Sequence, residues 1–268
     1  MIAKPEIKEQ EKIAFVLSSL QQTIEQQEKI IGKTKELKRS LMHRLFTDGL
    51  RGEELKETEI GLMPESWSAR RLKDVVEKTS QRDMTKTPDI QFKYIDVSSI
   101  SNESLKIIGS TTYKGSEAPS RARKVVKVND VLFATVRPTL KRIAYAGNEF
   151  DGEVCSTAFC VLRSVSTLSS RYLYYCVQRD SFIESLGKLQ RGASYPAVTD
   201  GNVKDQLIPF PMLDEQGEIA NTLWDIDNKI NHETVKNNVL KDLFKSMLQL
   251  LMTGEVRVKD IDFGEACE

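Results

Sequence analysis

The sequence predicts a protein of the α/β class, in its α+β form, with one compact domain of mixed strands and helices between two long helices. Three observations support this prediction. The chain contains an internal repeat with helical periodicity, its central part alternates strand-like stretches with turns, and 40% of its 268 residues are hydrophobic. A chain of this size and composition can bury a sizeable core.

The two long helices are predicted from the repeat. Residues 9–14, EQEKIA, return as residues 215–220, EQGEIA, so equivalent positions lie 206 residues apart. Within each copy the apolar residues follow at alternating steps of four and three, which is the period of a coiled-coil seam. Each copy runs for about 40 residues, or roughly 60 Å at 1.5 Å per residue. A single amphipathic helix would equally suit the surface of a globular core, but two copies favour a paired-helix spacer.

The predicted coiled-coil contacts are the apolar seam residues of the two copies. The first copy contributes Ile13, Leu17, Leu20, Ile24, Leu41 and Leu45, and the second contributes Ile219, Leu223, Ile226, Ile230, Met247 and Leu251. Polar residues interrupt both seams, and such groups can fix the register of paired helices at some cost in stability. They are Gln27, Thr34 and Lys38 in the first copy and Glu233 and Asn237 in the second.

The predicted domain limits lie where the residue composition and the hydrophobic periodicity change. They are 1–50 for the first helix, 51–211 for the central domain, 212–256 for the second helix and 257–268 for a tail. Pro64 to Trp67 opens the central domain and Pro209 to Pro211 closes it before Asp214, a suitable N-cap. The predicted strands are 92–97, 124–128, 131–136, 143–146 and 154–162. A helical segment is predicted at 168–189, with Tyr172, Tyr175, Cys176 and Phe182 in the core.

Several kinds of chemistry find no support in the residues. The chain has no phosphate-binding loop, no C-x-x-C pair among its four cysteines, and no histidine in the central domain, so we expect no catalytic triad and no metal site. It has no signal peptide and no apolar run long enough for a membrane span, so we expect a cytoplasmic protein. A metal-dependent nuclease stays open as an alternative, because carboxylates are available at Asp89, Asp96, Glu149, Asp151 and Glu153.

The positive signal is the placement of charge. Lys+Arg and Asp+Glu each total 39, so attraction to nucleic acid requires local clustering. Between residues 121 and 142 a single acid, Asp130, stands among seven basic residues, of which we expect Arg121, Arg123, Lys124, Arg137, Lys141 and Arg142 to contact DNA. The alternative is a solvated surface with intramolecular ion pairs.

A second candidate DNA-binding segment is 190–199. Its small residues leave the backbone open, and its varied hydrogen-bond donors suit a nucleic-acid groove. The expected contacts are Arg191, Ser194, Tyr195 and Thr199. The alternative is that this segment is only a connector.

A family resemblance rests on the order of several short motifs. These are GLMPESW at 61–67, RLKDV at 71–75, DVLF at 130–133 followed by Arg137 and Pro138, YPAVT at 195–199, and IPFP at 208–211 leading into EQGEIA. Together they resemble the successive landmarks of a type I restriction-modification specificity (S) subunit, over nearly the whole chain. Only one recognition domain is present, so the chain resembles a half form, or a subunit shortened at its N-terminal side.

The resemblance implies a non-catalytic function. It implies one target-recognition domain flanked by two helices that form an antiparallel coiled coil, and sequence-specific binding of double-stranded DNA at one half of a bipartite target. It also implies docking of methyltransferase (modification) subunits, which use S-adenosylmethionine for DNA methylation, and an indirect association with a translocating endonuclease subunit, which uses ATP and magnesium. No cofactor is expected in this chain.

Two further possibilities stay open. We expect that two copies can associate into a homodimer through their helix seams, which would make the target symmetric. Alternatively, a shortened subunit would act as a scaffold, a competitor or a recombination reservoir without strong DNA binding.

Overall fold

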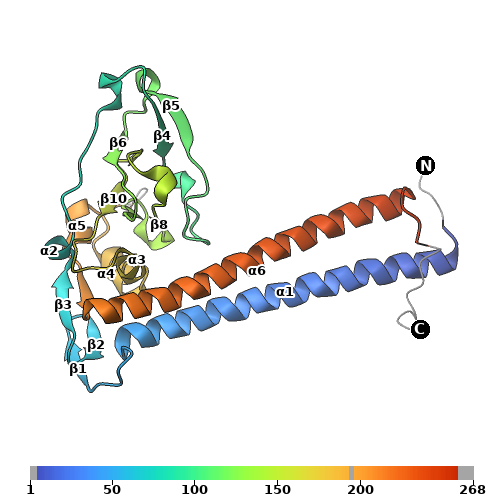
Figure 1. Ribbon diagram of the computed structural model, residues 1–268, viewed down its shortest axis with the longest axis horizontal. Helices are drawn as coiled ribbons and strands as arrows, with labels where there is room; N and C mark the ends of the chain where they lie inside the picture. Colours follow the sequence, from blue (N-terminus) through green and yellow to red (C-terminus); the bar gives the residue numbers. More distant parts are fainter. Residues whose placement is uncertain (1–4, 193–195, 259–268) are drawn as a thin grey trace. The chain divides into compact units, whose positions relative to one another are not determined.

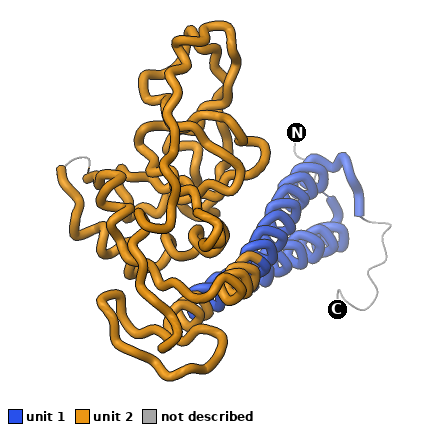
Figure 2. Tube along the Cα trace, turned by 60° about the vertical axis from the view of Figure 1, so that its left-hand side comes forward, with its two compact units in different colours: residues 1–40, 225–268 blue, residues 41–224 orange. Residues whose placement is uncertain are grey.

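The computed structural model describes residues 5–192 and 196–258, and these residues form two compact units. Unit 1 comprises Met1–Ser40 and Asp225–Glu268, and unit 2 comprises Leu41–Trp224 (Figure 2). The long helices α1 (Ile7–Thr47) and α6 (Leu213–Thr253) each run through both units. The limits predicted at 51 and 211 therefore lie within unit 2, because the ends of both helices pack into its core.

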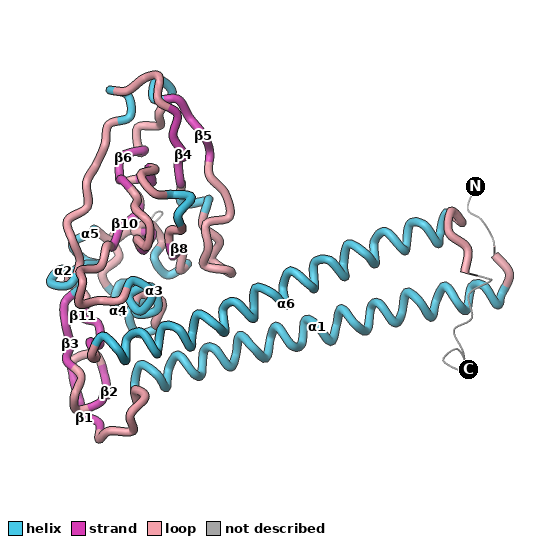
Figure 3. The backbone as a smooth tube through the Cα atoms, in the orientation of Figure 1, coloured by secondary structure: helices cyan, strands magenta, loops and turns pink. Residues whose placement is uncertain are grey.

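Unit 1 is an antiparallel pair made by α1 and α6, which lie side by side in Figures 1 and 3. Each helix has 41 residues and so measures about 60 Å. This confirms the two long helices predicted from the repeat and the antiparallel arrangement implied by the resemblance. The second helix begins at Leu213, so Asp214 lies in its first turn and is not its N-cap.

Polar contacts cross the seam of the helix pair. The Gln27 side chain is 3% exposed, and its Nε2 donates to Glu233 Oε2 at 2.6 Å. These two residues are 206 positions apart, which is the shift of the repeat. A local twofold axis of the pair therefore passes between them. Farther along, Lys38 Nζ lies 2.7 Å from an oxygen of Asp227, whereas Thr34 Oγ1 donates to the Ile30 carbonyl of its own helix.

Asn237 is a weak point of this seam. Its side chain is 6% exposed, and Oδ1 accepts no hydrogen bond from the described residues. A buried acceptor without a partner costs about 1–3 kcal/mol. We therefore expect Asn237→Leu to raise the free energy of unfolding of the helix pair by about 1 kcal/mol, measured by urea unfolding followed by circular dichroism at 222 nm.

The matched control for this prediction is Gln27→Leu. It should lower the free energy of unfolding, because it removes the donor that Glu233 accepts from. If Asn237→Leu destabilises the pair as much as Gln27→Leu does, the hydrogen bond between the Asn237 amide and Glu28 outweighs the cost of the unpaired Oδ1.

Unit 2 is a mixed α/β domain, as predicted. Its strands are β1 (Leu55–Thr58), β2 (Gly61–Pro64), β3 (Ser68–Arg71), β4 (Gln91–Ile95), β5 (Thr111–Lys114), β6 (Ala122–Val125), β7 (Val131–Ala134), β8 (Ile143–Tyr145), β9 (Val154–Ser156), β10 (Phe159–Leu162) and β11 (Leu207–Phe210). Its short helices are α2 (Leu72–Val75), α3 (Ser170–Cys176), α4 (Asp180–Lys188) and α5 (Asp200–Lys204).

The strands form small sheets instead of one large one. Among the described residues the sheets have the orders β1-β2, β10-β7-β8, β11-β3 and β5-β4-β9-β6. All the pairs are antiparallel except β4 with β9. The sheet β11-β3 joins the two ends of the domain, with Ser68 opposite Phe210 and Arg71 opposite Leu207. The chain therefore enters and leaves the domain at neighbouring positions.

Two predicted elements are each split in the structure. The stretch 154–162 forms β9 and β10 in different sheets, because a turn at Thr157 and Ala158 redirects the chain. The segment 168–189 forms α3 and α4, which are separated by residues 177–179. The four core residues predicted in this segment are all buried, as expected.

The main core joins these short helices to the ends of the long ones. It contains Trp67, Phe133 and Tyr172 from the domain, together with Leu45 and Phe46 from α1 and Ile219 and Leu223 from α6. The rings of Phe46 and Tyr172 lie 5.2 Å apart, centroid to centroid. The repeat residues nearest the domain therefore pack into its core. Of the other predicted seam residues, Ile24 and Leu251 are buried, and the rest are partly buried: Ile13, Leu17, Leu20, Leu41, Ile226, Ile230 and Met247.

Candidate nucleic-acid interface

Two loops that are far apart in the sequence lie together in unit 2. The first, loop A, is residues 135–142 after β7, and the second, loop B, is residues 190–199 after α4, described here except for 193–195. The Arg137 N–H donates to the Pro196 carbonyl at 2.7 Å, and the Val198 N–H donates to the Thr135 carbonyl at 3.0 Å. Loop B is closed by paired backbone hydrogen bonds between Arg191 and Ala197, both 3.0 Å.

Loop A has an unusual backbone conformation. Arg137 and Lys141 have φ values of 49° and 51°, in the left-handed region, on either side of a short 3₁₀ turn, Pro138–Leu140. Such residues cost about 1–3 kcal/mol each and persist where the surroundings hold them. Here Lys141 Nζ lies 2.5 Å from Asp180 Oδ1 on α4. Loop A is therefore held rigidly with the Arg137 side chain exposed.

The predicted DNA-binding residues fall into two groups. Arg121, Arg137, Arg191 and Thr199 are exposed, and Thr199 also caps α5 by accepting from the Asn202 N–H at 3.0 Å. Ser194 and Tyr195 lie outside the described residues. The other four residues form hydrogen bonds or ion pairs within the chain.

Four predicted residues have partners within the chain. Lys124 is 7% exposed, and its Nζ lies 2.5 Å from both Asp200 Oδ2 and the Phe159 carbonyl oxygen. Arg142 Nη1 donates to two backbone carbonyls, those of Val97 at 3.1 Å and Ile100 at 2.6 Å. Arg123 pairs with Asp83, as Lys141 pairs with Asp180. Hydrogen bonds from Arg123 and Thr85 lower the pKa of the Asp83 carboxyl to about 2.

These ion pairs change how the linear charge count is interpreted. Asp83, Asp180 and Asp200 lie outside the basic segment, but they neutralise three of its cations. The net positive charge available to a ligand is therefore smaller than the sequence indicated. Lys124, Lys141 and Arg142 hold the loops in place, whereas Arg121, Arg137 and Arg191 are exposed at the surface.

Two features of this region could not be predicted from the sequence. The exposed Arg82 lies beside Arg123, because its N–H donates to the Arg123 carbonyl at 2.8 Å, although about 40 residues separate them in the chain. Asp130, the one acid in the basic segment, is fully buried and accepts from Arg163 at two atoms. A scheme of strand pairing would have shown that Arg82 lies beside Arg123. No signal in the sequence shows that Asp130 is buried with Arg163.

Three of the five carboxylates considered for a nuclease make contacts that stabilise the fold. Asp96 takes part in a capping box, Asp151 Oδ1 accepts from the Val128 N–H, and Glu153 Oε2 accepts from the Lys93 N–H at 2.6 Å. Within residues 5–192 and 196–258, no three His, Cys, Asp or Glu side chains gather in a way that would hold a metal ion.

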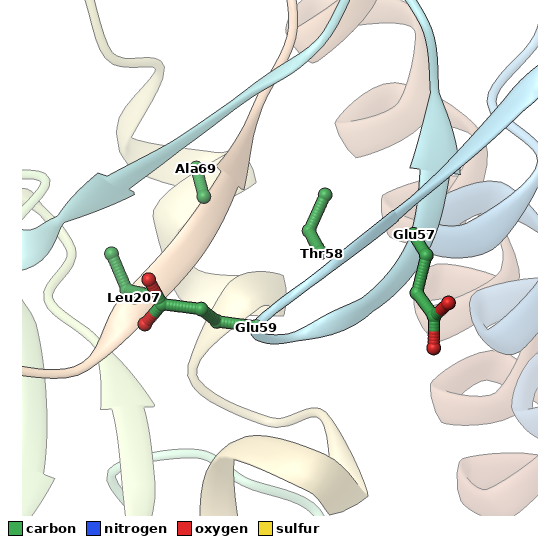
Figure 4. Close-up of a pocket in the computed structure, with 5 residues that line it drawn as sticks. All are labelled: Glu57, Thr58, Glu59, Ala69 and Leu207. Atoms are coloured by element: carbon green, nitrogen blue, oxygen red, sulfur yellow. The ribbon is translucent and has the colours of Figure 1, made fainter.

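The buried thiols and the surface pocket offer little support for other chemistry. Burial raises the pKa of Cys160 and of Cys176 to about 12, so these thiols are protonated and poor nucleophiles near neutral pH. A pocket beside the β1-β2 hairpin is lined by Glu57, Thr58, Glu59, Ala69 and Leu207 (Figure 4). Its lining has two carboxylates and no basic group, which does not suit a phosphate-bearing ligand. In the described part of the chain, none of the helices combines the length and the apolar character that a membrane span requires.

Comparison with known families gives a match over most of the chain. Residues 64–242 match the family described as the type I restriction modification DNA specificity domain. The chain is 27% identical, over 98% of its length, to the specificity subunit of the type I restriction enzyme MjaVIII from Methanocaldococcus jannaschii, and covers 63% of that relative. For the putative MjaX specificity subunit of the same organism the identity is also 27%, over 96% of this chain and 60% of the relative. The chain thus spans about three fifths of the length of these curated relatives.

Solved structures give a similar picture. The HsdS subunit from Thermoanaerobacter tengcongensis matches with a TM-score of 0.60 and 38% identity, over 67% of this chain and 46% of that one. The S subunit of a type I restriction-modification system from M. genitalium matches with a TM-score of 0.57 over 92% of this chain and 61% of that one. Its identity is 14%, so that likeness concerns the fold alone.

Proposed function

Because the chain belongs to the type I restriction-modification DNA specificity family, we propose that unit 2 binds double-stranded DNA sequence-specifically and reads one half of a bipartite target. The observation that carries this proposal is the pairing of loops A and B, which presents Arg137 and Arg191 from a rigid base. An arginine whose position is fixed recognises guanine in the major groove by donating bidentate hydrogen bonds to O6 and N7. The chain supplies specificity and no catalysis.

The exposed residues divide by role in this proposal. Arg82 and Arg121 lie on or beside the β6-β9 pair and would neutralise phosphates, which positions the domain without reading sequence. Arg137, Arg191 and Thr199 lie on loops A and B and would contact base edges. Lys124, Lys141 and Arg142 would act indirectly, by holding these loops.

The helix pair would dock the methyltransferase subunits. Val235, Val239 and Leu243 follow one another at steps of four on α6 and are exposed, and Ile30 and Leu37 form a similar exposed stripe on α1. Leu37 and Leu243 are equivalent positions of the repeat, so the local twofold axis places them on the same side of the pair. An exposed apolar stripe of this kind suits packing against helices of a partner. S-adenosylmethionine would then be held by those subunits, and ATP and magnesium by the endonuclease subunit.

A homodimer would use the same stripe. The seams predicted to join two copies already pair α1 with α6 within one chain, as the contacts of Gln27 and Lys38 show. Two copies and a methyltransferase subunit would therefore compete for one surface. By light scattering, the expected result on adding the methyltransferase is a complex that contains one copy of this chain in place of two.

A second candidate function is that of a competitor that occupies methyltransferase subunits without strong DNA binding. The internal ion pairs of Arg123, Lys124 and Lys141 favour it, because they reduce the charge available to DNA. The two functions share the docking surface and differ only in the affinity of the assembled complex for DNA.

The deciding experiment uses the complex of this chain with its methyltransferase subunit. A bound sequence is first selected from a randomised DNA library, and the affinity of the complex for that selected site is then measured at several salt concentrations. Arg137→Ala and Arg191→Ala should each lower the affinity for the selected site by about 10- to 100-fold, because a lost base contact costs about 1–3 kcal/mol. Affinity for unrelated DNA should change much less.

The matched control is Lys245→Ala, which removes one positive charge from an exposed position on α6. It should leave the selectivity unchanged. Equal losses on selected and unrelated DNA for Arg137→Ala would make it a phosphate contact, and a complex that assembles but binds no DNA would favour the competitor.

A further inference from the structure

Residues 80–82 run antiparallel to the edge strand β6 in unit 2. Gln81 lies opposite Lys124 in an antiparallel bridge, and the Arg82 N–H donates to the Arg123 carbonyl at 2.8 Å. In this register Arg82 lies directly opposite Arg123, and the two side chains are on the same side of the sheet. Like charges directly opposite each other are destabilising. An anion bound between the two arginines would remove this repulsion.

A β-bulge in β6 leaves Arg123 on the solvent side of the strand. Ala122 and Lys124 lie opposite consecutive residues of β9, so Arg123, between them, is the extra residue of the bulge. Ala122 and Lys124 are both buried, whereas Arg123 is partly exposed and Arg121 is exposed. Bulges are frequent beside functional sites, where they re-aim a side chain. We call Arg82, Arg121 and Arg123 the arginine face.

One acid, Asp83, contacts the arginine face. Its carboxylate forms an ion pair with Arg123, whose Nε also donates to the Ser120 carbonyl at 3.1 Å. Asp83 Oδ1 accepts two further hydrogen bonds, from the Thr85 N–H at 3.2 Å and from the Thr85 hydroxyl at 2.7 Å. Asp83 is therefore held in place by Thr85 as well as by Arg123.

The pair of Asp83 with Arg123 is open to exchange with a phosphate. The two side chains are 32% and 31% exposed, and ion pairs that solvent reaches in this way contribute little net free energy. A phosphate accepts bidentate hydrogen bonds from a guanidinium. Asp83 would keep both hydrogen bonds from Thr85 after losing Arg123. By contrast, the Lys124 side chain is only 9% exposed, so its ion pair is shielded from such exchange.

We infer that Asp83 is an electrostatic gate on the arginine face: it occupies Arg123 in the free protein, and a phosphate of duplex DNA displaces it on binding. Asp83 competes with every phosphate alike, because the exchange does not involve the bases. It therefore lowers the affinity for any duplex and limits non-specific binding. The inference rests on the proposed binding of DNA by unit 2, but it concerns contacts with the DNA backbone and not the reading of sequence.

The test measures how the complex of this chain with its methyltransferase subunit binds a duplex of unrelated sequence, over a series of salt concentrations. Asp83→Asn removes the charge and keeps a side-chain oxygen that can accept from Thr85. It should raise the affinity about three- to tenfold, because Arg123 no longer has to leave an ion pair. The matched control is Asp89→Asn, which removes the same charge from an exposed acid six residues further along the chain. It should change the affinity less than about twofold, because solvent screens an exposed charge that pairs with no arginine.

Arg123→Gln, added to Asp83→Asn, tests whether Arg123 carries the gain. The double variant should bind unrelated DNA more weakly than the wild type does. The slope of log affinity against log salt concentration should also fall in magnitude by about 0.9 relative to Asp83→Asn, the value for one phosphate contact. A double variant that binds as tightly as Asp83→Asn overturns the inference, and so does an Asp83→Asn variant that binds no better than Asp89→Asn.

The selected site separates this inference from the proposed function. If Asp83→Asn raises the affinity as expected, but the complex prefers no sequence from the library, the gate stands and sequence-specific reading fails. If the complex prefers its selected site, but Asp83→Asn leaves binding to both duplexes unchanged, the proposed function stands and the gate fails. Near-ultraviolet circular dichroism of each variant checks that unit 2 is folded.

Discussion

Asp130→Ala should lower the free energy of unfolding of the α/β domain by about 3 kcal/mol, because it leaves the largely buried Arg163 guanidinium without its partner. Asp130 is fully buried, and its two oxygens accept from Arg163 Nε and Nη2, both at 2.8 Å. The Lys127 N–H also donates to it at 2.8 Å. Urea unfolding followed by tryptophan fluorescence measures the change.

The double variant Asp130→Ala with Arg163→Met is the control, because it removes both charges. It should recover at least half of the loss, since replacing a whole buried ion pair by apolar groups is far less costly than breaking it. A single variant that loses less than about 1 kcal/mol would place this pair with surface ion pairs.

Glu215→Ala should cost about 3 kcal/mol, because the buried Trp67 Nε1 and the partly buried Leu50 N–H lose their acceptor together. Trp67 is 1% exposed, so water cannot easily replace the carboxylate. Thermal unfolding measures the stability, and near-ultraviolet circular dichroism reports whether the indole is still fixed.

The neighbouring Asp214 is the matched control for Glu215. Its pair with Arg51, at 2.7 Å, is exposed, so Asp214→Ala should cost less than about 1 kcal/mol. Equal effects of the two variants would mean that negative charge at the start of α6, and not the hydrogen bonds of Glu215, stabilises this end of the helix.

The long helices could be predicted from the sequence, because their periodicity extends over about 40 residues and occurs twice. Polar positions in the seam could also be predicted, and Gln27, Lys38 and Glu233 do contact residues of the opposite helix. The strands β4, β7 and β8, and the stretch that forms β9 and β10, were predicted because they are rich in β-branched and aromatic residues. The predicted strand 124–128 shares only Lys124 and Val125 with β6. The core positions of α3 and α4 followed from their aromatic content.

Other parts depend on contacts that local patterns do not encode. The strands β1, β2, β3, β5 and β11 have four residues each and are largely polar or interrupted by proline. The pairs Lys124–Asp200 and Arg123–Asp83 join residues that are distant in the chain, 76 positions apart in the first case, so a linear count of charge overestimates the basic surface. The position of Arg82 beside Arg123 likewise follows from pairing and not from sequence spacing.

The neighbouring entry and exit of the α/β domain have a consequence for how the chain folds. The contacts Gln27–Glu233 and Lys38–Asp227 close loops of 206 and 189 residues, and closing such a loop in an unfolded chain is entropically expensive. Once β3 and β11 pair, with Arg71 opposite Leu207, the first turns of α6 and the last turns of α1 are already anchored in one core. Helix pairing then only extends an existing nucleus toward the termini, so we expect the α/β domain to fold first and the distant ends of the helices to associate last.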